Sequence, residues 1–386
     1  MSANAKCGVS LINIAVLLIA MTATGMSAVK VQKQSKEAEA YRLAGEYAKE
    51  ERWQDLVEHC KRYLRDNPSD AEMISILGVA YSELGKHEES LDAFKRVVQL
   101  RPPNQGDRFN LGVAHSKAGR EQEAVEIYQK LIKDYPDMAL TYINLGGSYV
   151  NLNRSGEAVE PLKQATKLSP EDADATYNLG VAYERQERFK EAAESYRRAL
   201  KLMPDFFQAH YNLGGVLVRM GKPGEAVESY KLAVRVKPED ANAHFNLGVA
   251  YNDQELWSEA SNAFKQSAKL KPEFADAWFN LGAAYEKQER FEEEIEACLQ
   301  AIKLKPDFAE AHYNLGVALS KLSRWAEAVE AFKQAVKIKS GYAEANFNLG
   351  VACLNLGDQR AAKAAYESLK TLDADLASRL LKLITQ

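Results

Sequence analysis

Asparagine residues at a constant interval are the feature of this sequence whose type and spacing could do chemistry. The tripeptide Asn-Leu-Gly occurs eight times, and the interval from each copy to the next is always the same. An asparagine amide offers a hydrogen-bond donor and an acceptor together, which suits the backbone of an extended peptide. The row consists of Asn110, Asn144, Asn178, Asn212, Asn246, Asn280, Asn314 and Asn348.

Histidines and cysteines give weaker indications of chemistry. His210, His244 and His312 share one place relative to this tripeptide, but each belongs to a different copy, too far from the others to share one metal ion. Tyr142 and Trp278 hold the same place in other copies, which favours a planar packing residue. Four cysteines form no Cys-x-x-Cys pair, and we interpret them as small core hydrophobes. They are Cys7, Cys60, Cys298 and Cys353.

Motifs for other reaction chemistry are missing from the sequence. It contains no glycine-rich phosphate loop, nucleophile elbow, His-Glu-x-x-His motif or Cys/His ligand spacing. The formal net charge of −4 provides no overall basic field that would attract nucleic acid. We therefore predict no catalytic residues, no metal, no cofactor, no nucleic-acid partner and no small-molecule substrate.

The asparagines belong to a 34-residue repeat that predicts paired helices. Each copy contains two amphipathic segments of about a dozen residues, apolar at spacings of three and four, and proline closes most copies. Glycine returns at the eighth place, where its cost of about 1 kcal/mol in a helix indicates a close contact between two helices. The ten copies begin at residues 37, 71, 105, 139, 173, 207, 241, 275, 309 and 343.

Several copies depart from this pattern. Ala44 replaces the glycine in the first copy, and Glu294 stands where other copies have a small residue. Pro161 falls inside a second helix, where we expect a kink. The doublet Pro102–Pro103 predicts a loosened joint between two repeats that could act as a hinge.

The repeat resembles that of the tetratricopeptide repeat family, which has the same period. The first half of the family pattern is matched literally by Trp278, Leu281, Gly282 and Tyr285. The likeness covers residues 37–376 and implies an all-α fold, a right-handed superhelical solenoid of about ten helix-turn-helix repeats. Residues 377–386 would form a C-terminal capping helix over the last apolar edge.

In that family the first helices of the repeats line a concave groove, and the resemblance places three sets of residues there. The sixth-place asparagines would bind a polypeptide, as in the similar array of O-GlcNAc transferases, where an asparagine ladder holds polypeptides. Alternatively, the asparagines are only solvated and the fifth-place aromatics pack between neighbouring first helices. The remaining candidates are aromatic residues of the fifth place and cations of the thirteenth: Phe109, Tyr177, Tyr211, Phe245, Phe279, Tyr313, Phe347, Arg185, Arg219 and Lys287.

An uncharged stretch at residues 7–29 precedes the repeats. Its most apolar part, residues 11–21, has the length of a signal-peptide core, whereas the whole stretch is long enough to span a bilayer. We interpret residues 1–29 as a signal peptide or an N-terminal membrane anchor, and residues 30–36 as a polar lead-in. The protein is then exported to a periplasmic or other extracytoplasmic space or, alternatively, anchored in a membrane by residues 7–29.

Together these observations predict a non-catalytic scaffold. It would bind other proteins or extended peptide segments in its groove and help to assemble a larger complex. An alternative is a non-catalytic targeting subunit of a glycosyltransferase that acts in trans, because no room remains here for the sugar-transfer domain that follows such arrays in O-GlcNAc transferases.

Overall fold

The computed structural model describes residues 28–385, and every regular element in this range is a helix. The predicted all-α class and the predicted helix-turn-helix repeats are therefore confirmed. The signal peptide or anchor predicted for residues 1–29 lies outside the described residues, apart from its last two positions. None of the described helices is both long enough and apolar enough to cross a bilayer.

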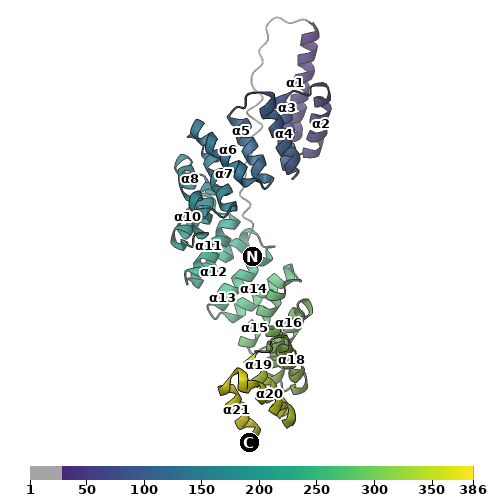
Figure 1. Cartoon of the computed structure of the whole chain (residues 1–386), viewed down its shortest axis with the longest axis vertical. Coiled ribbons are helices and arrows are strands. Elements are labelled where there is room, and N and C mark those ends of the chain that lie inside the picture. Colours follow the sequence, from purple (N-terminus) through teal and green to yellow (C-terminus); the bar gives the residue numbers. More distant parts are fainter. Residues whose placement is uncertain (1–27, 386) are drawn as a thin grey trace. The chain divides into compact units, whose positions relative to one another are not determined.

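The helices fall into two compact units, residues 1–204 and 205–386, and within each unit successive helices pack in chain order (Figure 1). Odd-numbered helices from α3 to α19 begin at the first residue of a repeat. The first unit contains α1 (Ala28–Lys49), α2 (Trp53–Asp66), α3 (Ala71–Glu83), α4 (His87–Leu100), α5 (Gln105–Lys117), α6 (Glu121–Asp134), α7 (Ala139–Asn151), α8 (Ser155–Leu168), α9 (Ala173–Glu184) and α10 (Phe189–Leu202). The second contains α11 (Phe207–Arg219), α12 (Pro223–Val236), α13 (Ala241–Asn252), α14 (Trp257–Leu270), α15 (Ala275–Lys287), α16 (Phe291–Leu304), α17 (Ala309–Lys321), α18 (Trp325–Ile338), α19 (Ala343–Asn355), α20 (Gln359–Leu372) and α21 (Ala374–Thr385).

Two helices begin earlier than the sequence predicted, and a third contains an internal proline. Helix α1 begins at Ala28, so the predicted lead-in at residues 30–36 is helical and continuous with the first repeat. Helix α8 continues through Pro161, and the kink predicted there stays a prediction. The C-terminal helix α21 begins at Ala374, three residues before the start predicted for the capping helix.

The two helices of most hairpins approach closely at the eighth place of the repeat. In most repeats the glycine there faces the side chain at the twenty-fourth place, on the second helix. A methyl group on Gly112 would lie 2.5 Å from Cε1 of Tyr128, and one on Gly146 would lie 2.4 Å from Cγ of Leu162. Carbon atoms in contact are about 3.5–4.0 Å apart, so no larger residue fits. The predicted packing role of these glycines is confirmed.

The turn between the two helices of a repeat requires a left-handed backbone at the fifteenth place. Glycine supplies it in four repeats, with φ between 71° and 79°. Six repeats place another residue there, with φ between 54° and 59°: Glu51, Asn153, Glu187, Glu255, Glu289 and Ser323. A left-handed conformation costs such residues about 1–2 kcal/mol, so the packing of the hairpin overrides the local preference of the chain in these turns.

The C-terminal helix α21 packs back onto the last hairpin. Gly350 faces Leu380 of α21, and a methyl group added to this glycine would lie 2.5 Å from Cδ2 of the leucine. The guanidinium of Arg379 lies 5.0 Å from the ring centroid of Phe347 on α19. Helix α21 therefore covers the apolar end of the second unit.

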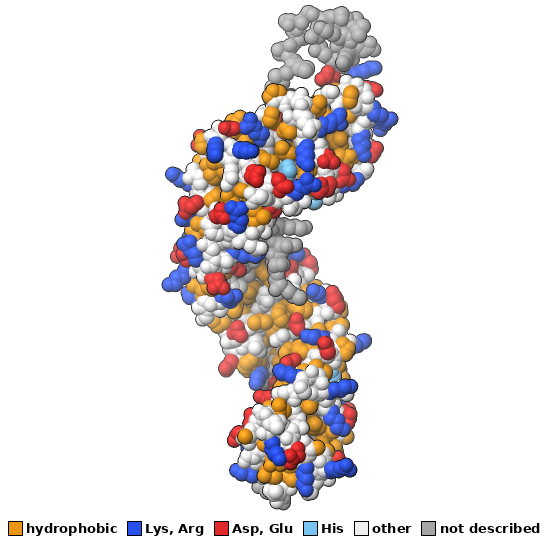
Figure 2. Space-filling model, viewed as in Figure 1, with side chains coloured by type: hydrophobic (Ala, Val, Ile, Leu, Met, Phe, Trp, Pro, Cys, Tyr) orange, Lys and Arg blue, Asp and Glu red, His pale blue; other side chains and the backbone are white. Residues whose placement is uncertain are grey.

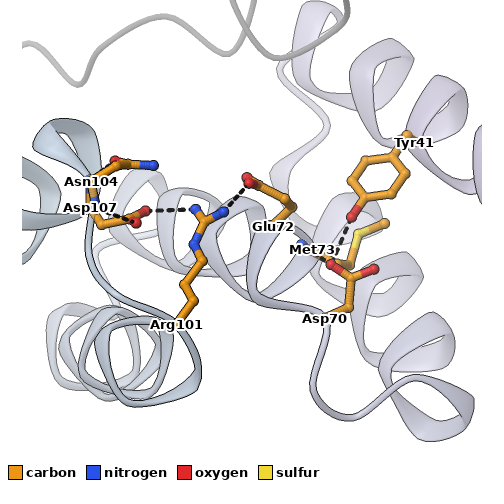
Figure 3. Close-up of polar contacts among 7 residues, drawn as sticks. All are labelled: Tyr41, Asp70, Glu72, Met73, Arg101, Asn104 and Asp107. Carbon is orange, nitrogen blue, oxygen red and sulfur yellow. Dashed lines mark hydrogen bonds and ion pairs between the residues drawn. The ribbon is translucent and has the colours of Figure 1, made fainter. Parts of the chain in front are cut away.

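Arg101 links two repeats of the first unit (Figure 3). Its guanidinium forms ion pairs with Glu72 of α3 and with Asp107 of α5, the latter at 3.0 Å between Nη2 and Oδ1. Asn104 caps α5, because its side chain accepts from the backbone N–H of Asp107 while the Asp107 carboxylate accepts from the backbone N–H of Asn104. This clamp spans Pro102–Pro103 and opposes the hinge predicted there.

Asp70 joins the first two repeats in the same region (Figure 3). Its carboxylate caps α3 by accepting from the backbone N–H of Met73 at 3.0 Å, and it also accepts from the hydroxyls of Tyr41 at 2.7 Å and Tyr63 at 2.9 Å. Burial raises the pKa of the Tyr41 hydroxyl, and the hydrogen bond to Asp70 is the next largest cause of this rise. This hydroxyl therefore remains a donor, and the first repeat stays attached to the cap of the second.

The substitution Gly248→Ala is expected to destabilise the protein more than Gly282→Ala. A methyl group on Gly248 would lie 2.7 Å from the ring of Phe264, whereas one on Gly282 would meet no ring, and its nearest neighbour would be Sγ of Cys298, at 3.1 Å. Overpacking costs about 1–3 kcal/mol, and each kcal/mol lowers the melting temperature by about 2–4 °C in a unit of this size.

At Gly282 the helix propensity gained from alanine, about 1 kcal/mol, offsets the smaller clash. Thermal unfolding followed by circular dichroism measures both variants. Equal losses of melting temperature would contradict the packing argument.

The substitution Arg101→Met is expected to destabilise the joint between α3 and α5. It leaves the carboxylate of Asp107, which is only 4% exposed, without its cation. The loss should be about 2 kcal/mol, between the values for exposed and for buried ion pairs. The matched control is Arg108→Met, which removes an exposed pair with Asp134 and should change stability by less than about 1 kcal/mol. Urea unfolding compares the two, and a similar effect for both would rule out the clamp.

Candidate functional site

Some sixth-place asparagines connect neighbouring repeats in the second unit. Nδ2 of Asn246 on α13 donates to Oη of Tyr211 on α11 at 2.8 Å, and Nδ2 of Asn348 on α19 donates to Oη of Tyr313 on α17 at 3.1 Å. Each bond joins the fifth place of one first helix to the sixth place of the next. These amides therefore have a structural role besides any role in binding.

A phenylalanine at the fifth place removes this hydrogen-bond acceptor. Phe245 and Phe279 hold that place one repeat before Asn280 and Asn314. Nδ2 of Asn280 donates instead to the carbonyl of Asp276 in its own helix at 2.8 Å, and the side chain of Asn314 makes no hydrogen bond to the residues that the structure describes. Neither of these two amides is used to join repeats.

The exposure of the predicted site residues changes along the chain. In the first unit Asn144, Asn178, Phe109 and Tyr177 are buried, and Asn110 is half-buried. The cations of the thirteenth place, Arg185, Arg219 and Lys287, are exposed. In the second unit every predicted asparagine and aromatic is half-buried: Asn212, Asn246, Asn280, Asn314, Asn348, Tyr211, Phe245, Phe279, Tyr313 and Phe347.

The fifth-place rings pack on two sides. Phe245 contacts Phe264 of the second helix, with ring centroids 5.6 Å apart, and Phe274 at the start of the next repeat, at 4.9 Å. Phe279 and Phe308 repeat the second contact at 4.6 Å. Packing between neighbouring first helices is therefore part of the role of these rings, and their exposed parts remain accessible to a partner.

A row of lysines beside these ring pairs was missed by the sequence prediction. Nζ of Lys271 lies 5.1 Å from the ring centroid of Phe274, and Nζ of Lys305 lies 4.6 Å from that of Phe308. Such distances suit cation–π contacts. The same pair recurs as Lys339 and Tyr342. The signal was present in the sequence, because each lysine stands three residues before an aromatic at the end of a copy.

Rings at the fourth place fix the joints between repeats. Nε1 of Trp278 donates to the carbonyl oxygen of Pro272 at 3.0 Å, and Nε2 of His244 lies 2.9 Å from the carbonyl oxygen of Pro238. Because a carbonyl only accepts, the histidine nitrogen carries the hydrogen. Histidine thus makes the same contact as tryptophan, which supports the interpretation as a packing residue. No group of three or more His, Cys, Asp or Glu residues within 28–385 could hold a metal ion.

Surface charge on the face drawn in Figure 2 and the thiols within residues 28–385 point to no further site. Cationic and acidic side chains are interspersed over the face seen in Figure 2. The cysteines in the described part of the chain, Cys60, Cys298 and Cys353, are buried and free. Burial raises the pKa of the Cys60 thiol to about 12, so this thiol is not a nucleophile at neutral pH. The arrangement can bind a partner through amides, rings and cations.

Four family models match the chain. The model described as "Cilia and flagella-associated protein 70 C-terminal domain" matches residues 172–379, which is more than half of the sequence. Models of tetratricopeptide repeats match residues 146–187, 108–137 and 71–104. A comparison with curated proteins found no match.

Solved structures with similar repeats match parts of the chain. The structure of YrrB, described as "a TPR protein with an unusual peptide-binding site", is 29% identical over 48% of this chain and 96% of its own, with a TM-score of 0.45. A structure of MamA is 28% identical over 43% of this chain and 97% of its own, with a TM-score of 0.41. The structure of the APC/C hetero-tetramer Cut9-Hcn1 is 18% identical over 78% of this chain and 59% of its own, with a TM-score of 0.42.

Proposed function

We propose that this chain is a non-catalytic scaffold. It belongs to the tetratricopeptide repeat family, through the domain described as the C-terminal domain of cilia and flagella-associated protein 70. It binds extended segments of partner proteins along its first helices and so helps to assemble a larger complex. The matching families consist of repeats rather than of catalytic domains, which supports an interaction role.

One observation carries this proposal: half-exposed amides and rings recur in the same register on successive first helices of the second unit. We call this set the amide–aromatic row. It consists of the fifth- and sixth-place side chains of α13, α15, α17 and α19: Phe245, Asn246, Phe279, Asn280, Tyr313, Asn314, Phe347 and Asn348. Asn280 and Asn314 form no bond to a neighbouring repeat, so their amides have the most capacity for a partner.

The spacing of the row suits an extended polypeptide. Neighbouring packed helices lie about 8–10 Å apart, and an extended chain advances about 3.3 Å per residue. One amide would therefore meet the partner's backbone about every third residue. Because an amide both donates and accepts, it can bond either group of that backbone, which makes the recognition independent of the partner's side chains.

Neighbouring positions supply contact area and charge. The ninth place of the same helices carries small, half-buried residues, Val249, Ala283 and Val317, which leave room for a peptide backbone. The half-exposed rings of the row offer the apolar anchors that dominate many interfaces. Exposed Lys287 and Lys321 at the ends of α15 and α17 would attract acidic side chains of the partner.

The double variant Asn280→Ala/Asn314→Ala is expected to bind peptides about tenfold more weakly than the native protein, because each lost hydrogen bond costs about 0.5–1.5 kcal/mol. The probes are peptides selected by the native full chain from a displayed library of random sequences. Their dissociation constants are then measured by fluorescence anisotropy against both proteins.

The matched control is Asn262→Ala/Gln334→Ala, which removes two exposed amides from the second helices α14 and α18. This control should keep the native affinity, and circular dichroism verifies that both variants are folded. Equal binding by native protein and Asn280→Ala/Asn314→Ala would remove the amides from the proposed site. If the library yields no binding peptide at all, the scaffold proposal itself fails.

We also propose that the N-terminal residues direct the chain out of the cytoplasm, on the support of the uncharged stretch at residues 7–29. Expression of the full chain in a host with an export pathway should yield an extracytoplasmic protein. Mass spectrometry of its N-terminus distinguishes a cleaved signal, with residues before about position 29 missing, from an intact anchor recovered with the membrane. An intact chain in the cytoplasmic fraction would contradict both forms of the proposal.

A further inference from the structure

Helix α16 contains a pair of residues that breaks the packing rule of the other hairpins. Most repeats place a small residue at the twentieth place and a ring or leucine at the twenty-fourth, as in Ala260 with Phe264. The repeat that begins at residue 275 reverses the sizes, with Glu294 at the twentieth place and Cys298 at the twenty-fourth. In this repeat the larger of the two side chains stands one helical turn earlier than in the other repeats. It still occupies the space between the two helices, but it carries a carboxyl group.

The first repeat contains the same reversal without the carboxyl. There Leu56 holds the twentieth place and Cys60 the twenty-fourth, and both are 0% exposed. Glu294 and Cys298 are also 0% exposed. The comparison shows that a leucine and a cysteine suffice to fill a hairpin of this kind, so packing alone does not require a glutamate.

The carboxyl group of Glu294 is buried without compensation. Neither of its oxygens has a hydrogen-bond partner among the described residues. Nearby Arg290 pairs with Glu293 instead, at 2.7 Å, on the exposed side of α16. A buried polar group without a partner costs free energy, and an ionised one costs much more unless it is neutralised.

The charged and titratable groups around Glu294 increase this cost. From α15, Glu286 acts on it with a like charge, and on α16 itself the thiol of Cys298 lies one turn away. Helix α17 contributes no charged group that acts on it within the described part of the chain. Burial is the main cause, and the negative charge of Glu286 the second, of a pKa of Glu294 raised to about 8. The group is therefore a neutral acid at neutral pH.

We propose that Glu294 makes the hairpin of α15 and α16 a pH-sensitive element of the second unit. As a neutral acid the side chain packs in the hairpin as Leu56 does in the first repeat. When it loses its proton it must reach solvent, and α16 then separates from α15. The equivalent hairpin of α17 and α18 has Ala328 and Phe332 at these two places and therefore has no ionisable side chain there.

The direction of the pH effect follows from the two protonation states. In the closed hairpin the carboxyl has a pKa of about 8, and in the open hairpin it returns to the ordinary value of 4.5. Between these values only the closed form holds the proton, so opening becomes more favourable as the pH rises. The stabilisation of the closed hairpin by the proton on Glu294 is complete below pH 4.5. It decreases as the pH rises to about 8 and is constant above that value. From pH 6 to pH 8 the equilibrium constant for opening should rise about fiftyfold.

This opening would act on the amide–aromatic row, because Phe279 and Asn280 of that row belong to α15. Loss of contact with α16 would free α15 to shift and would weaken a bound peptide at this repeat. That consequence rests on the proposed function, whereas the opening itself does not.

Hydrogen exchange of the full chain, followed by mass spectrometry, tests the proposal without any ligand. Protection factors of peptides within α16 are compared at pH 6 and pH 8 after correction for the chemical exchange rate, with α18 as the internal reference. The variants are Glu294→Gln, which keeps the shape but cannot titrate, and Glu294→Leu, which copies the first repeat.

In the native protein the protection of α16 should fall at least tenfold between the two pH values, while that of α18 changes by less than about twofold. In both variants the protection of α16 and that of α18 should each change by less than about twofold between the two pH values. The proposal is overturned if native α16 loses no more protection than α18, or if α16 of Glu294→Leu loses as much as native α16. Because the reference helix lies in the same chain, the first comparison is decisive even if Glu294→Gln does not fold.

Discussion

Two helices can come into close contact only where one of them lacks a side chain, and the eighth-place glycine provides that point in nearly every repeat. The ring of Tyr128 lies against Gly112, and the ring of Phe264 against Gly248, at distances that exclude even a methyl group. This contact fixes the rotation of each first helix about its axis. The fifth and sixth places therefore fall on the same face in every hairpin, and the amide–aromatic row is a consequence of that register.

The joints between repeats meet one geometric requirement with different chemistry. At the residue before each first helix, Asp70 and Asp240 accept backbone hydrogen bonds as caps, whereas Phe274 and Phe308 pack against a ring of the preceding first helix. Either solution attaches one first helix to the next. At Tyr211 and Tyr313 the asparagine of the next repeat, Asn246 or Asn348, also bonds the tyrosine hydroxyl. The phenylalanine joints lack that bond and leave their asparagines for other partners.

Stability need not be uniform along such an array, because each hairpin depends mainly on its own contacts and on those of its neighbours. Strain enters through left-handed residues such as Glu187 and Glu289, and the buried acid Glu294 adds an electrostatic cost in one hairpin. A binding surface that consists of repeated units can therefore be controlled at one unit while the others keep their structure.

The sequence by itself determined the helices, their pairing and their register, since glycine, proline and the apolar positions return with one common period and each has a local physical meaning. It also indicated the packing role of Gly248 and of the fourth-place rings. Only the tertiary structure decided which candidates are accessible and which groups their amides bond. Asn246 and Asn280 hold the same place in their repeats, but only Asn246 lies beside a hydroxyl of the preceding repeat. It likewise placed Arg101 across the joint at Pro102–Pro103, where composition alone suggested a hinge, and showed that the carboxyl of Glu294 has no partner. Such outcomes depend on side chains far apart in the chain, and the pattern within one repeat does not contain them.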